Sequence, residues 1–201
     1  MNNKQKFSAT LLLVFFGTVA LADFEQSAFK DKSYIFKFDV VENASRFIFD
    51  DAPLFDDGYP AYGNSFVTQG YIYPYGFLEQ HEGVFANGEP AYPDKVIGVW
   101  TCRGFFIGDG AHTTTGPMVI TTQTYDFFDK PGYQSGQYST DRLIISEGYE
   151  LADLNRQFSR PIIGGTGPFS RIKGEALQTL MGFNAYMGVQ LRFVIKAANV
   201  N

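Results

Sequence analysis

Apolar and polar residues alternate with a period of two along much of this chain, and that pattern favours β structure. In residues 185–195, AYMGVQLRFVI, one side of an extended strand is apolar and the other is mixed. Residues 96–107, VIGVWTCRGFFI, and 119–128, VITTQTYDFF, are similarly rich in β-branched, aromatic and apolar residues. After residue 22, no window keeps the helical spacing of apolar residues for three turns. About eight strands separated by turn residues predict an all-β sandwich or barrel.

Two glycines in one predicted strand favour the barrel. Gly98 and Gly104 lie on the same face of segment 96–107, and glycines inside strands mark sharp bends or the close approach of another backbone. A small closed barrel requires such bends. We expect the barrel domain to span residues 65–201, without a second domain or an internal repeat. Residues 23–64 include an acidic, turn-rich stretch and are predicted to form an arm or a lid.

The first 22 residues have the pattern of a secretory signal peptide. Two lysines precede the apolar stretch ATLLLVFFGTVALA, which ends in the small-residue cleavage pattern Ala20-Leu21-Ala22. The alternative is an uncleaved anchor, but the apolar stretch is short for a spanning helix. We therefore predict a secreted or periplasmic protein that has no membrane association after cleavage.

Charge and cysteine content exclude several classes of partner. Removal of Lys4 and Lys6 with the leader would leave 14 basic and 21 acidic residues, a balance that disfavours binding to nucleic acid or anionic membranes. Cys102 is the one cysteine, so no internal disulfide can form. With two histidines, it cannot complete a closed zinc site of nitrogen and sulfur ligands. We expect neither a metal nor another cofactor.

The glycine-rich segment 161–176, PIIGGTGPFSRIKGEA, has to be distinguished from a phosphate-binding loop. A P-loop needs Lys-Ser or Lys-Thr after its last glycine, and the dinucleotide fingerprint needs a third glycine where Ser170 stands. The residues that follow indicate a strand rather than a helix with a free N-terminus. The glycines are therefore predicted to form a tight connection between two strands.

This segment resembles the hallmark segment of plant dirigent proteins, an apolar pair followed by G-G-T-G-x-F, and a similar segment occurs in plant allene oxide cyclases. The resemblance extends to DKVIGVWTCRGFF, YDFFDKPGYQSGQYSTDRLIISE and AYMGVQLRFVIKA, so that it covers residues 94–197. It implies an eight-stranded antiparallel β-barrel of the calycin type, commonly a homotrimer, with an apolar cavity. In the cyclases a cysteine lines the cavity at the position of Phe106 here, and Cys102 lies on the same strand face.

Charged residues within strands are the catalytic candidates, because a buried charge is costly unless it is paired. Arg103 would bind an oxyanion or a carboxylate if it points inward, or lie in a subunit interface or in solvent if it points outward. Asp126 is either a general acid or base or a turn residue. Glu150 is either an inward carboxylate or part of a solvated strand end, and the same holds for Glu147.

Aromatic residues and the cysteine are the candidates for ligand binding. They are Trp100, Cys102, Phe106, Tyr71, Tyr73 and Tyr125. Trp100 would stack on a ligand or belong to the core. Cys102 lacks a nearby base and is expected to be an inert thiol. Tyr71, Tyr73 and Tyr75 alternate along GYIYPYG, so they share one side of the strand and would line the cavity mouth or pack outside the barrel.

Three functions remain open at this stage. The first is an exported barrel that binds a hydrophobic small molecule and steers its cyclisation, isomerisation or coupling by shaping it, as an isomerase, a cyclase or a dirigent-type auxiliary without a cofactor. The second is a non-catalytic, lipocalin-like binding protein. The third is a structural or interaction module whose barrel is filled by its own side chains. Strand periodicity alone does not tell which face is inside.

Overall fold

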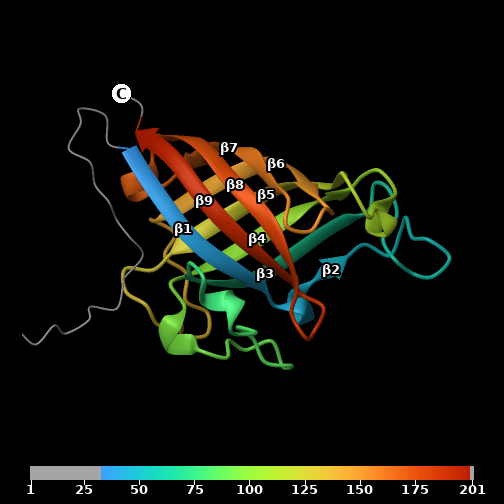
Figure 1. Cartoon of the computed structure of the whole chain (residues 1–201), viewed down its shortest axis with the longest axis horizontal. Coiled ribbons are helices and arrows are strands. Elements are labelled where there is room, and N and C mark those ends of the chain that lie inside the picture. Colours follow the sequence, from blue (N-terminus) through green and yellow to red (C-terminus); the bar gives the residue numbers. More distant parts are fainter. Residues whose placement is uncertain (1–32, 200–201) are drawn as a thin grey trace, which may run out of the picture.

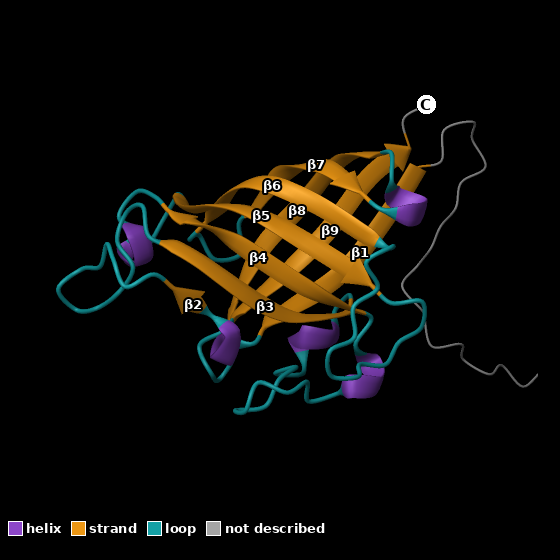
Figure 2. Cartoon of the chain, turned by 180° about the vertical axis from the view of Figure 1, so that it is seen from behind, coloured by secondary structure: helices purple, strands orange, loops and turns teal. Residues whose placement is uncertain are grey.

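The computed structural model describes residues 33–199, which form one antiparallel sheet rolled into a barrel (Figure 1). The strands are β1 (Ser33–Glu42), β2 (Ile48–Phe49), β3 (Ser65–Pro74), β4 (Gly98–Phe106), β5 (Pro117–Phe127), β6 (Leu143–Leu151), β7 (Gln157–Gly165), β8 (Ile172–Phe183) and β9 (Val189–Asn199). The short 3-10 helices of this region are η1 (Ala44–Arg46), η2 (Phe77–Glu79), η3 (Pro93–Lys95), η4 (Gly110–His112) and η5 (Gly167–Phe169). Figure 2 shows them in the connections outside the barrel wall.

The sheet closes because β1 pairs with both β9 and β3. Its strand order is β1-β9-β8-β7-β6-β5-β4-β3-β2, and the additional pairing between β1 and β3 joins the ends of the eight-stranded barrel. The ninth strand, β2, pairs with β3 beside this closure. The predicted eight-stranded antiparallel barrel is therefore confirmed, with one short strand added.

The first barrel strand lies in the segment that we expected to be an arm or a lid. Within β1, Phe36, Phe38 and Val40 point inward and are buried. On its other face, Asp39 and Val41 are buried beneath the residues that follow β3. A domain boundary at residue 64, as expected from the sequence, would therefore separate β1 from the other barrel strands. β1 is needed to close the barrel. The predicted signal peptide lies outside the described residues.

The barrel interior has two chemically different halves. Aromatic rings fill the half where β1 begins and the middle of the barrel: Phe38 lies 5.4 Å from Tyr125 and 5.2 Å from Phe193, measured between ring centroids. Phe36 lies 5.4 Å from Phe169. The inward residues near the end of β1 are largely polar. The core is therefore apolar through only part of the barrel, and the remainder holds the candidate site.

The glycine-rich segment connects β7 to β8, as its sequence predicts. Gly167 begins η5 with a φ of +53°, a backbone conformation that favours glycine. A Cβ atom there would also collide with the carbonyl oxygen of Asp141. The segment thus forms a tight turn packed against another loop. Within residues 33–199, no helix is long and apolar enough to cross a membrane.

Candidate functional site

A cluster of buried polar side chains occupies the end of the barrel where β1 ends and β9 begins. We call this cluster the polar end. Its members come from seven strands, one from each: Glu42, Thr68, Cys102, Thr121, Glu150, Arg160 and Gln178. Each lies in a strand whose inward positions alternate with outward ones, so strand parity is what directs these side chains toward one another.

Glu150 is the central acceptor of the polar end. Its Oε1 accepts a hydrogen bond from Thr121 Oγ1 at 2.5 Å, and its Oε2 accepts one from Gln178 Nε2 at 2.8 Å. Arg160 Nη1 lies 3.6 Å from Oε1. Only 12% of the Glu150 side chain is exposed, whereas that of Arg160 is fully buried. The ion pair is therefore held inside the barrel wall with a narrow exposed edge.

Arg160 is anchored mainly by oxygen atoms of β5 and β6. Its Nη2 donates to the carbonyl oxygen of Thr121 at 3.0 Å and to Thr121 Oγ1 at 2.8 Å. Its Nη1 donates to the carbonyls of Gly148 and Tyr149, and its Nε to Ser146 Oγ. The guanidinium group is thus fixed in a single orientation beside Glu150.

The pKa of Glu150 reflects two opposing influences. Burial alone would raise this pKa, because it penalises the charged form. The nearby Arg160 and the hydrogen bonds from Thr121 and Gln178 outweigh burial, so the pKa lies below the usual value. Glu150 is therefore an ionised carboxylate in a largely desolvated site.

Glu42 is a second buried carboxyl group at this end, and its pKa is shifted the other way. Its Oε1 accepts a hydrogen bond from Thr68 Oγ1 at 2.5 Å and its Oε2 one from the Val189 amide at 2.8 Å. Burial raises its pKa more than these two hydrogen bonds lower it, and the charge of Glu150 adds to the rise. Glu42 thus retains its proton to higher pH than an ordinary glutamate.

A hydrogen-bonded chain joins the polar end to the aromatic half. Gln178 Oε1 accepts from Gln123 Nε2 at 3.1 Å, and Gln123 Oε1 accepts from Trp100 Nε1 at 3.2 Å and from the Tyr125 hydroxyl at 2.7 Å. This chain fixes the amide groups of both glutamines. Glu150 is therefore held in place by partners that reach the centre of the barrel.

Cys102 lies between the two carboxyl groups. Its Sγ is 3.4 Å from Glu150 Oε1, and its backbone pairs with that of Thr68, which binds Glu42. Burial, followed by the charge of Glu150, raises the pKa of the thiol well above its usual value. The sulfur is therefore a protonated donor to Glu150 rather than a nucleophilic thiolate.

Two carboxyl groups with pKa values shifted in opposite directions suit acid–base chemistry. One retains a proton that it can donate, and the other stays ionised and can accept one or stabilise a cation. Arg160 adds a fixed positive charge that can stabilise a developing oxyanion. Among the described residues, no group of three or more His, Cys, Asp or Glu side chains is placed to hold a metal ion.

Five of the nine predicted site residues point into the barrel. Glu150 and Cys102 belong to the polar end, and Trp100 and Tyr125 lie at its inner boundary. Phe106 is buried at the same end of β4, where its ring lies 5.2 Å from that of Phe66. The structure brings these residues together with Glu42 and Arg160, and their roles stay predictions.

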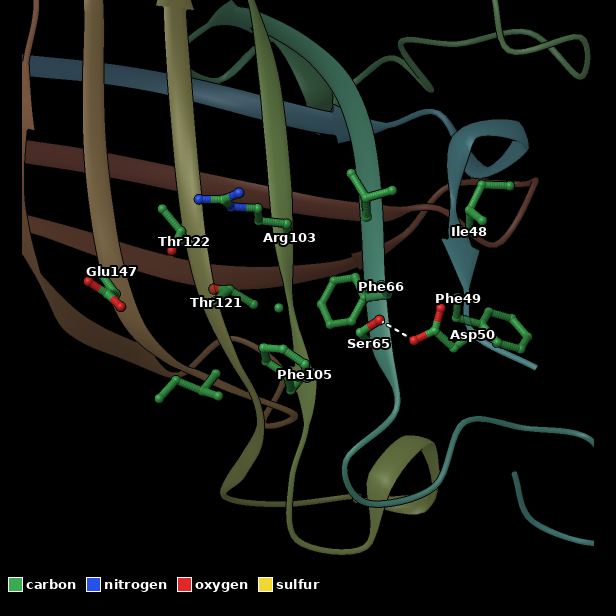
Figure 3. Close-up of a pocket in the computed structure, with 13 residues that line it drawn as sticks. Ile48, Phe49, Asp50, Ser65, Phe66, Arg103, Phe105, Thr121, Thr122 and Glu147 are labelled. Carbon is green, nitrogen blue, oxygen red and sulfur yellow. Dashed lines mark hydrogen bonds between the residues drawn. The ribbon is translucent and has the colours of Figure 1, made fainter. Parts of the chain in front are cut away.

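The other four lie on the outer face of the barrel. Arg103 is exposed and lines a surface hollow of about 630 Å³ between β2 and the outer faces of β3–β6 (Figure 3). Asp126 is buried under the β5–β6 connection, where its Oδ2 accepts from the Ser139 amide and burial raises its pKa. Tyr71 and Tyr73 donate to the carbonyls of Gly88 and Gly83, so they anchor the β3–β4 connection.

Sequence reasoning missed Glu42 and Arg160. Glu42 belongs to the segment that we assigned to an arm. Arg160 lies two residues before the buried Ile162 in β7 and so shares its inward face. Counting back by two from the apolar pair before the glycines would have identified this arginine as a candidate.

The fold is similar to that of two solved structures. No family model and no curated protein sequence matches this chain. The pterocarpan synthase dirigent protein PsPTS1 matches with a TM-score of 0.59 at 13% identity, covering 86% of this chain and 99% of that one. The pterocarpan synthase dirigent protein GePTS1 matches with a TM-score of 0.58 at 11% identity, covering 93% and 100%. At these identities the likeness concerns architecture, and the chain has the barrel fold of the dirigent proteins.

Proposed function

We propose that the protein binds a hydrophobic, unsaturated small molecule at the polar end of its barrel and steers an acid–base step such as cyclisation, isomerisation or coupling. The observation that carries this proposal is the buried Glu150–Arg160 pair in contact with Thr121 and Gln178. A buried ion pair is often no more stabilising than apolar residues of the same volume, so a role beyond folding accounts for it better.

The opposite pKa shifts of the two carboxyl groups suggest a different role for each. Glu42 would donate a proton to the bound molecule, because burial favours its protonated form. Glu150 would accept a proton or stabilise positive charge, while Arg160 would stabilise negative charge on an oxygen of the ligand. The aromatic residues beneath, including Trp100 and Tyr125, would contact the apolar body of the molecule.

A second candidate is supported by the packing of the aromatic half. Phe38, Tyr125 and Phe193 pack ring against ring in the middle of the barrel. A barrel that is filled in this way would serve as a structural or interaction module. A lipocalin-like protein would differ from the proposed function because it would bind and release its ligand without converting it.

Native mass spectrometry of the mature protein from its own host tests all three functions. The proposed function predicts a retained small molecule that is lost in Glu150→Gln and Arg160→Met but kept in Lys173→Gln, an exposed position on β8. Once the compound is identified, its conversion by the parent and not by Glu42→Gln would support catalysis. Retention without conversion would support the binding protein, and a ligand-free parent would contradict both.

We further propose that the chain is exported and assembles into a homo-oligomer, the trimer that the resemblance implies. The signal-peptide pattern of residues 1–22 supports export. An exposed apolar face on β4, β5 and β6, which includes Phe105, Ile120 and Tyr149, supports assembly.

A further inference from the structure

The outer faces of β4, β5 and β6 carry an apolar row that is open to solvent. Phe105, Ile120 and Tyr149 are consecutive partners across these three strands, and 54%, 37% and 56% of their respective surfaces are exposed. Other parts of the outer surface differ. Residues after β3 cover Tyr71 and Tyr73, while β8 and β9 present Lys173, Glu175 and Lys196. Ile35 on β1 and Ile163 on β7 are also exposed, whereas the apolar row crosses β4, β5 and β6, the strands on the side of the barrel seen in Figure 2.

A charged row runs directly beside the apolar row. Arg103, Thr122 and Glu147 are consecutive partners across the same three strands, and both charged side chains are exposed (Figure 3). Neighbouring strands lie roughly 4.8 Å apart, so the two charges flank β5 at a backbone separation of roughly 10 Å. Within residues 33–199, neither Arg103 nor Glu147 has an ion-pair partner.

The apolar row and the charged row together form a self-complementary face, so two copies of this face can pair with each other. A rotation axis that runs parallel to the strands outside β5 brings β4 of one copy against β6 of the next. Arg103 then faces the opposite charge of Glu147, and Phe105 faces the aromatic ring of Tyr149, while Ile120 of each copy lies nearest the axis. Both a two-fold and a three-fold axis produce these contacts, because β4 and β6 lie on opposite sides of β5.

We propose that this face binds a second copy of the chain, with β4 of one copy against β6 of its neighbour and Arg103 paired with Glu147 across the contact. Charge complementarity within one face argues for self-association rather than for another partner, because each copy supplies both charges. The exposed rings would be buried in the same contact, as aromatic residues and arginine commonly are at interfaces. The self-association proposed above would occur through this face, and the contact would form whether or not a ligand is bound.

Charge reversal tests the pairing. Arg103→Glu places two like charges opposite each other at every contact, and Glu147→Arg does the same. Each single variant should weaken association by about tenfold or more, because opposed like charges are strongly unfavourable. The double variant R103E/E147R restores opposite charges and should associate as the parent does. Lys173→Glu, a charge reversal on β8, is the matched control and should have no effect.

Sedimentation equilibrium gives the mass and the dissociation constant of each variant, and the thermal unfolding midpoint establishes that each is folded. A parent of two or three chains, weakened singles and a restored double variant would support the proposal. An oligomeric parent that the single reversals leave unchanged would overturn the face but not the self-association. A monomeric parent would overturn both. Ligand retention is measured separately by mass spectrometry. Failure of the proposed chemistry can therefore be distinguished from failure of the proposed interface.

Discussion

Glu42 and Glu150 are both buried glutamates of the polar end, yet their surroundings shift their pKa values in opposite directions. Burial dominates for Glu42 and raises its pKa, whereas Arg160 and hydrogen bonds outweigh burial for Glu150 and lower it. Each shift changes how the free energy of unfolding depends on pH, because folded and unfolded chains then bind protons differently. The assignment of acid and base is therefore testable without a ligand.

Replacement of each residue by glutamine should give pH dependences of opposite sign. As the pH rises above 4.5, unfolded Glu42 loses its proton before folded Glu42 does, so its contribution to stability falls. Relative to the parent, Glu42→Gln should gain stability with rising pH, by about 1.4 kcal/mol for each pH unit between the two pKa values. The contribution of Glu150 is present above 4.5 and is lost as the pH falls through its lower folded pKa. The deficit of Glu150→Gln should therefore shrink on acidification.

Urea unfolding between pH 3 and pH 8, followed by the fluorescence of Trp100, measures both dependences. Trp100 is the single tryptophan and is buried beside Gln123, so its emission reports the fold. Parallel pH curves for the parent and both variants would contradict the assignment.

At the residue scale, the sequence shows which side chains share a strand face but not which face is inside. In β4, Phe106 is buried and Phe105 is exposed, although the two residues are chemically identical. The same ambiguity separates Glu150, which points inward, from Arg103, which points outward. Only the closure of the barrel decides between the faces, and it depends on pairings between strands that are distant in sequence.

Elements whose conformation depends on local sequence were predicted more accurately than the facing of individual side chains. The glycine-rich connection between β7 and β8 was predicted from turn residues alone, because backbone conformation at Gly167 is a local property. In contrast, β1 was assigned to an arm although Phe36, Phe38 and Val40 alternate as a strand requires. The acidic, turn-rich residues after β1 concealed this alternation, and its partner β9 lies at the far end of the chain.

Two alanine substitutions in the β7–β8 connection should differ in their effect on stability. Gly167→Ala requires a positive φ and places a Cβ against the carbonyl oxygen of Asp141, so it should destabilise by about 1–2 kcal/mol or more. Gly164→Ala is the matched control, because nothing lies within 4 Å of its added Cβ. Urea unfolding at neutral pH compares the two variants. Equal losses of stability would show that the turn does not depend on the conformation of Gly167.

On the scale of the whole molecule, barrel closure depends on β1. This strand pairs with β9 over most of its length and with β3 at its end, so its removal would expose the edges of both neighbours. Unpaired edges promote intermolecular pairing and aggregation. Removal would also expose the core around Phe38 and eliminate Glu42 from the polar end.

A chain that begins at Ser65, the boundary expected from sequence, should therefore aggregate or fail to fold, whereas one that begins at Ser33 should fold. A synthetic peptide of residues 33–42, added in excess, should pair with β9 and β3 and restore the barrel, because its inward residues fit an existing gap. A matched peptide in which Phe36 and Phe38 are replaced by serine should not. Restoration is measured as the return of a blue-shifted Trp100 emission and a cooperative unfolding transition. A shortened chain that folds without the peptide would show that residues 65–201 form a complete barrel by another strand pairing, and the position of Glu42 in the candidate site would then be incidental.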